Sequence, residues 1–157
     1  MTARTAARTS IDRSLAERID RWRTEARRFP LPLIELGMRL AVGATFFRSG
    51  MNKLESFDTA IALFRDEYQL PLVPPAIAAY LGTAVELTAP VLLAVGLGAR
   101  LGAAALLAMT LVIQFLVYPD NWPEHLMWAS ILAYVLRNGP GTLSIDRLIA
   151  DRLFGRS

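Results

Sequence analysis

The fold is decided by two long apolar stretches that follow one another: residues 76–98, AIAAYLGTAVELTAPVLLAVGLG, and residues 101–118, LGAAALLAMTLVIQFLVY. The first stretch contains one charged residue, Glu86, and the second contains none. A helix of this length can cross a hydrocarbon layer about 30 Å thick. The two stretches therefore predict membrane-spanning helices.

The composition of the whole chain agrees with this prediction. Of its 157 residues, 54% are hydrophobic and 20% are charged, whereas soluble domains have about 45–50% apolar residues. The sequence contains no cysteine and a single histidine. The missing cysteines exclude disulfides, thiol chemistry, thiolate-bound zinc and iron–sulfur clusters bound by the chain itself.

The positive charge is concentrated at the ends of the chain and explains the net charge of +3. Eight arginines precede Pro30: Arg4, Arg8, Arg13, Arg18, Arg21, Arg23, Arg27 and Arg28. Basic residues that flank membrane spans mark the cytoplasmic side. We therefore expect a multi-pass protein of the bacterial inner membrane with both termini in the cytoplasm, whose partner is the lipid bilayer and which does not bind nucleic acid.

The predicted fold class is an all-α membrane protein, a bundle of four transmembrane helices. The four spans are expected at about residues 31–50, 76–98, 101–118 and 122–137, within a domain of residues 31–141. Residues 1–30 form a basic cytoplasmic head, disordered over residues 1–9, with an amphipathic helix that begins at Ser10. That helix either lies on the inner leaflet or packs on the protein. Residues 56–68 are predicted to form a short interfacial helix with residues 57, 61 and 64 on one apolar face, and residues 142–157 an interfacial tail.

Charged residues inside the first two spans need partners, because an ionisable group at membrane depth is costly. Arg39 and Glu86 are expected to lie near mid-depth in antiparallel spans. We predict an Arg39–Glu86 ion pair, with Glu35, one helical turn from Arg39, as a second acceptor. The alternative is a purely structural pair that fixes helix register.

A second group of polar residues is expected at the outer ends of the spans, where it forms a polar mouth. Its members are Arg48, Lys53, Gln114, Tyr118, Asp120, Asn121, Trp122 and His125. Such a mouth could bind a quinone head group, a metal or a partner protein. The simpler interpretations are that His125 caps the fourth helix and that Tyr118, Trp122 and Trp128 are aromatic-belt anchors. One histidine supplies too few ligands to predict a metal site.

Several short motifs resemble those of DoxX family membrane proteins. They are Arg39-Leu40 followed by Gly43, Ser49-Gly50 with Lys53, Gly82 with Glu86, and Gly96 with Arg100. Longer stretches, FFRSGMNKL, LFRDEYQLPLVPP, MTLVIQFLVYPDNWPEHLMWA and GPGTLSID, are similar to one DoxX branch found beside genes for copper-binding modified peptides of the bufferin type. The resemblance implies a four-helix inner-membrane protein.

Four functions follow from the residues and the resemblance. The first is an accessory role in a metal or oxidative-stress system, such as maturation or export of a copper-binding peptide, with a partner protein encoded nearby. The second is a small, quinone-linked oxidoreductase subunit whose redox centre belongs to its partner. The third is a small transporter or proton path through Glu35, Arg39, Glu86 and Gln114. The fourth is a purely structural role. A non-catalytic subunit, which could form homo-oligomers, is favoured over an enzyme, and quinone is the one cofactor considered.

Overall fold

The computed structural model describes residues 16–25, 28 and 30–155. Contacts divide the chain into two units, Met1–Leu31 and Pro32–Ser157. In the first unit, residues 16–25 are helical and exposed. The predicted disorder of residues 1–9 and the predicted helix start at Ser10 lie outside the described residues.

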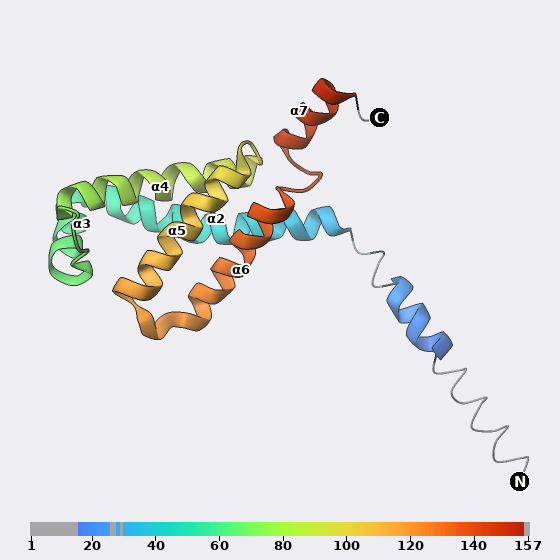
Figure 1. Cartoon of the computed structure of the whole chain (residues 1–157), viewed down its shortest axis with the longest axis horizontal. Helices are drawn as coiled ribbons and strands as arrows, with labels where there is room; N and C mark the ends of the chain where they lie inside the picture. Colours follow the sequence, from blue (N-terminus) through green and yellow to red (C-terminus); the bar gives the residue numbers. More distant parts are fainter. Residues whose placement is uncertain (1–15, 26–27, 29, 156–157) are drawn as a thin grey trace, which may run out of the picture. The chain divides into compact units, whose positions relative to one another are not determined.

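The second unit is built of helices (Figure 1). They are α2 (Leu31–Glu55), α3 (Phe57–Leu63), the π-helix η1 (Phe64–Tyr68), α4 (Pro75–Val95), α5 (Ala99–Val112), the π-helix η2 (Ile113–Val117), the 3-10 turn η3 (Pro119–Asn121), α6 (Trp122–Asn138) and α7 (Ile145–Phe154). The described residues contain no strand. The all-α prediction is therefore confirmed for this part of the chain, and α2 extends past the expected end near residue 50.

Helices α4 and α5 form a tight antiparallel pair whose boundaries follow from proline and glycine. Pro75 occupies the first turn of α4, where a fixed φ and a missing N–H cost little. Gly96, with φ +71°, ends the helix in the left-handed conformation, which glycine adopts without steric cost. The short turn that follows returns the chain alongside α4, and α6 packs on α5 in the same way (Figure 1).

Four helices share one hydrophobic core. It contains Val42, Phe46, Ala89, Leu93, Ala103, Leu106, Leu132 and Val135. Gly102 allows the backbones of α4 and α5 to approach closely, because a Cβ there would lie 2.9 Å from the Ala89 carbonyl oxygen. Gly43 packs on Pro90 in an ordinary contact, with a Cβ there 3.5 Å from the Pro90 carbonyl oxygen. Small residues at helix interfaces permit such contacts, as expected for membrane bundles.

The segment between α2 and α4 packs against the start of α4. Phe64, Ala78 and Ala79 are buried together there, and Phe57 and Ile61 pack on them. The spacing of residues 57, 61 and 64 predicted one apolar face, and the structure confirms that this face is covered.

Two helices are long and apolar enough to span a membrane among the residues that the structure describes: Pro75–Val95 and the continuous stretch Ala99–Val117. Most of the residues of both spans are not buried by the protein, and Leu101 and Phe115 on the second are 75% and 73% exposed. A helix that is apolar on all sides and largely uncovered fits lipid surroundings.

Helix α7 is attached to the turn between α4 and α5 by the Asp146 side chain. Its carboxylate accepts hydrogen bonds from the backbone N–H groups of Gly98, at 2.8 Å, and Ala99, at 3.2 Å. The Asp146 N–H donates to the Gly96 carbonyl at 2.9 Å. An acidic group at the start of α5 also complements the positive end of that helix dipole.

Candidate ligand cavity and two buried polar clusters

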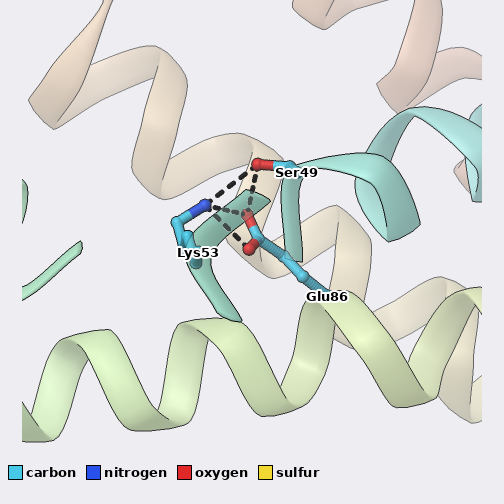
Figure 2. A network of polar contacts seen from close by, with 3 residues as sticks. All are labelled: Ser49, Lys53 and Glu86. Carbon is cyan, nitrogen blue, oxygen red and sulfur yellow. Dashed lines mark hydrogen bonds and ion pairs between the residues drawn. The ribbon is translucent and has the colours of Figure 1, made fainter. Parts of the chain in front are cut away.

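Lys53 and Glu86 form a buried ion pair between α2 and α4, with Ser49 as third member (Figure 2). The Lys53 ammonium donates to both Glu86 carboxylate oxygens at 2.8 Å and to the Ser49 hydroxyl oxygen at 2.9 Å. The Ser49 hydroxyl donates to Glu86 Oε1 at 3.1 Å. The two charged side chains are only 9% and 7% exposed. All three ammonium hydrogens are used, which offsets part of the cost of removing both charges from water.

The geometry of α2 brings Lys53 to Glu86 for a simple reason. Residues 39, 42, 43, 46, 50 and 53 of α2 are buried, and their spacing of three and four residues puts them on one helix face. Gly50 brings this face close to α4, because a Cβ there would lie 2.9 Å from Leu87 and 3.0 Å from the Glu86 Cβ. Lys53, one turn further along, therefore reaches Glu86 directly.

The predicted Arg39–Glu86 ion pair is wrong. Arg39 instead donates to two backbone carbonyls, that of Leu93 at 2.9 Å and that of Leu143 at 2.5 Å. Leu93 lies seven residues beyond Glu86, about 10 Å along the axis of α4. The prediction compared the membrane depths of Arg39 and Glu86, each counted from the expected end of its own span. Because α2 continues to Glu55, the residues opposite Glu86 are those near Gly50 rather than Arg39.

Arg39 is the centre of a separate group that we call the Arg39 cluster: Glu35, Arg39, Gly96, Tyr134, Gly141, Leu143 and Ser144. Arg39 is fully buried and holds the end of α4 against the loop that precedes α7. Glu35 accepts a hydrogen bond from the Tyr134 hydroxyl at 3.0 Å and lies against Gly141. The prediction that Glu35 accepts a hydrogen bond from Arg39 is therefore also wrong, because Arg39 donates to backbone carbonyls and Glu35 accepts from Tyr134. The cluster joins three segments through backbone groups and side chains.

A cavity of about 550 Å³ lies beside the Lys53–Glu86 pair. Its polar lining residues are Ser49, Lys53, Tyr68, Glu86, Tyr118, Asn121, Glu124 and His125. Its apolar walls include Phe64, Val85, Ala105, Met109, Ile113 and Trp128. A mostly apolar cavity of this size, with a few polar groups, is typical of sites for small organic ligands.

His125 lies on the side of the cavity formed by α6 and is held by Gln114. Its Nδ1 lies 2.7 Å from Gln114 Oε1, and the Gln114 amide nitrogen donates to the Pro119 carbonyl at 2.8 Å. The imidazole also packs against Trp128, with ring centroids 5.3 Å apart. His125 is 3% exposed, so it is a buried residue with a fixed ring and not merely a helix cap at an interface.

Two tyrosines connect the segment before α4 to the end of η2 beside the cavity. The Tyr118 hydroxyl donates to Glu67, and the Tyr68 and Tyr118 rings meet edge to face with centroids 5.8 Å apart. The hydrogen bond to Glu67, followed by burial, raises the pKa of Tyr118. Burial also raises the pKa of Tyr68. Both hydroxyls therefore keep their protons above the usual range of tyrosine.

The predicted polar mouth is brought together only in part. Lys53, Tyr118, Asn121 and His125 line the cavity, and Gln114 reaches it through its hydrogen bond to His125. The remaining three predicted members are exposed and do not line the cavity: Arg48, Asp120 and Trp122.

Ser49, Tyr68 and Glu124 line the cavity, but the sequence analysis did not include them among the predicted site residues. Ser49 could have been found from its position one turn before Lys53 on the same helix face. Tyr68 and Glu124 lie in segments whose path depends on tertiary packing. Within the described residues, no three histidine or carboxylate side chains gather where they could hold a metal ion.

These features define a class: a helical membrane protein with a buried ion pair beside an apolar cavity. The DoxX family model matches residues 34–119, more than half of the chain. The chain therefore belongs to the DoxX family. The match includes Lys53, Glu86 and Gln114 and ends before His125. No curated protein and no solved structure matches the chain.

Proposed function

We propose that this DoxX protein is a multi-pass subunit of the bacterial inner membrane that binds the head group of a quinone in its cavity. The redox centre that exchanges electrons with this quinone belongs to a protein partner, since the chain has no cysteine to hold an iron–sulfur cluster. The observation that carries the proposal is the cavity of about 550 Å³, apolar over most of its wall and polar at Lys53, Glu86 and His125.

The proposed topology has four spans, formed by α2, α4, α5 with η2, and α6, with both termini in the cytoplasm. Its support is the distribution of charge. Arginines dominate the residues before α2, and Arg100 and Arg137 flank the ends of α5 and α6. The segments at the other helix ends carry Asp58, Asp120 and Glu124. Basic residues favour the cytoplasmic side.

An accessory role in a copper-peptide system is a different proposal that rests on the resemblance of four sequence stretches to one DoxX branch. It predicts that the gene lies beside a peptide precursor or a peptide-modifying enzyme. A transport or proton path through Glu35, Arg39, Glu86 and Gln114 is less well supported, because Arg39 and Glu86 belong to separate clusters. The cavity favours the quinone proposal over both.

The test of the quinone proposal is the ligand content of the protein purified from native membranes in mild detergent. Organic extraction and mass spectrometry should find quinone with the wild-type chain. Ala108→Phe, which places a ring in the cavity wall, should lose it. Leu101→Phe is the matched control, because Leu101 is an exposed residue of the same helix that does not line the cavity.

Two outcomes would contradict the quinone proposal. One is wild-type protein that purifies without quinone and without a redox partner. The other is quinone that remains with Ala108→Phe as fully as with Leu101→Phe, which would place the molecule on the outer surface of the helices.

A further inference from the structure

The two ring nitrogens of His125 have different surroundings, and Gln114 decides which of them carries the hydrogen. The Gln114 amide nitrogen donates to the Pro119 carbonyl at 2.8 Å, an interaction that only the NH₂ side of the amide can make. Its oxygen therefore faces His125 Nδ1 at 2.7 Å. An amide oxygen only accepts hydrogen bonds, so Nδ1 must carry the hydrogen.

The neutral His125 ring is then an acceptor on its other side. With the hydrogen on Nδ1, Nε2 holds a lone pair and cannot donate. No residue that the structure describes forms a hydrogen bond with Nε2, and the one hydrogen bond of the ring is made by Nδ1. Since His125 is 97% buried and lines the cavity, this lone pair is available to a molecule inside the cavity.

The Lys53–Glu86 pair contributes no free donor on its side of the cavity. The three Lys53 ammonium hydrogens point at Ser49 Oγ and at the two Glu86 oxygens, and the Ser49 hydroxyl hydrogen points at Glu86. The Tyr118 hydroxyl hydrogen is likewise used by Glu67. Tyr68, Asn121 and Trp128 are the lining residues whose side chains carry donors outside these contacts, and none of them forms a hydrogen bond with the imidazole. The carboxylate oxygens retain acceptor capacity, because each can accept more than one hydrogen bond.

We infer that this cavity selects a ligand that presents a hydroxyl group to Nε2 of His125, and so binds the reduced quinol form of a quinone in preference to the oxidised form. The inference rests on the proposed function and specifies the redox form that its site takes. A quinol hydroxyl can donate to Nε2. An oxidised quinone offers only carbonyl acceptors, which would leave Nε2 facing another lone pair in a buried site.

The expected preference for the quinol is on the order of tenfold, the size of one well-formed hydrogen bond between buried groups. Preferential binding of the reduced form makes a bound quinone easier to reduce. For a two-electron couple a tenfold preference raises the reduction potential of the bound molecule by about 30 mV.

The experiment compares two probes, decylubiquinol and decylubiquinone, on the full-length wild-type protein. The protein is reconstituted in phosphatidylcholine nanodiscs without oxygen, and binding is followed by quenching of tryptophan fluorescence, since Trp128 lines the cavity. We expect the quinol to bind about tenfold more tightly than the quinone.

Two variants test the role assigned to His125. His125→Phe should abolish the preference by weakening quinol binding alone. Gln114→Leu should reduce the preference, because without the Gln114 oxygen Nδ1 has no acceptor to hold its hydrogen and Nε2 can carry the hydrogen instead. Ser130→Ala, on the exposed side of α6, is the control and should keep the wild-type preference. Circular dichroism shows whether each variant is folded.

The outcomes separate this inference from the proposed function. Equal binding of both probes by the wild-type protein, or tighter binding of the quinone, overturns the inference and leaves a quinone site in place. Binding of neither probe overturns both. A quinol preference that survives in folded His125→Phe also overturns the inference. The wild-type comparison decides the matter even where a variant does not fold.

Discussion

The Arg39 cluster and the Lys53–Glu86 pair are both buried and polar, and both include a residue of the same face of α2. They differ in what surrounds them. Arg39 donates to the carbonyls of Leu93 and Leu143 and is enclosed by protein. Lys53 and Glu86 satisfy one another and border a cavity of about 550 Å³.

This difference shows that burial of a charge does not by itself identify a functional site. Both groups cost free energy to remove from water, and both fix how α2 meets other segments. Only the second lies beside space that a ligand can occupy. We therefore propose a structural role for the Arg39 cluster and a ligand-binding role for the cavity beside the Lys53–Glu86 pair.

The largest effect is expected from Arg39→Met. The buried Leu93 carbonyl and the partly buried Leu143 carbonyl would lose their donor, at about 1–3 kcal/mol each, so the free energy of unfolding should fall by about 4 kcal/mol in sum. Thermal unfolding in detergent, followed by circular dichroism, measures this loss. Arg48→Met, at an exposed position of the same helix, is the control. If Arg39→Met and Arg48→Met were equally stable, the structural role proposed for Arg39 would be contradicted.

The next effect concerns the ion pair. Glu86→Ala leaves the Lys53 ammonium buried without its partner, which should cost about 3 kcal/mol. The double change Lys53→Met with Glu86→Leu should cost less than Glu86→Ala alone, because it leaves no buried charge unpaired. Both variants should retain less quinone than wild type. A double variant that is no more stable than Glu86→Ala would show that the two residues do not interact.

A smaller effect is expected at the turn that follows α4. Gly96 and Gly98 both have positive φ, +71° and +57°, where alanine costs about 1–2 kcal/mol. At Gly96 a Cβ would also lie 2.5 Å from the Ser144 Cβ and 2.6 Å from Arg39 Nη1, whereas Gly98 faces open space. Gly96→Ala should therefore unfold at a lower temperature than Gly98→Ala. If Gly98→Ala unfolded at the lower temperature instead, the Arg39 cluster would be able to move aside for a Cβ at Gly96.

The smallest effect is expected from Tyr118→Phe, which removes the hydrogen bond to Glu67 at about 1 kcal/mol. The raised pKa of Tyr118 means that the folded protein favours the protonated hydroxyl. This contribution to stability is complete below the unfolded pKa and is lost as the pH rises through the folded one. An alkaline titration followed by phenolate absorbance should lack one late-titrating tyrosine in the variant. A titration unchanged from wild type would contradict the assigned hydrogen bond.

Much of the helical architecture could be predicted from the sequence, because the signals are local. Apolar length, the prolines before residue 76 and Gly96 locate α4, and the spacing of residues 57, 61 and 64 gives the packed face of the α3–η1 segment. Lys53, Glu86 and His125 could be selected as candidates because polar groups among apolar residues need partners. Their actual partners could not be predicted, since pairing depends on the register between helices.

The sequence by itself therefore determined the class of the protein, the helical segments and the short set of polar residues that must be satisfied inside it. These follow from the free-energy cost of leaving a polar group unpaired in an apolar environment. That cost shapes the residue pattern of each segment separately, so it can be seen without knowing how the segments pack. Only the tertiary structure decided that Lys53 rather than Arg39 meets Glu86, and that Gln114 orients His125. Lys53 and Arg39 lie fourteen residues apart on α2, and the close contact at Gly50 brings the Lys53 end of the helix to Glu86.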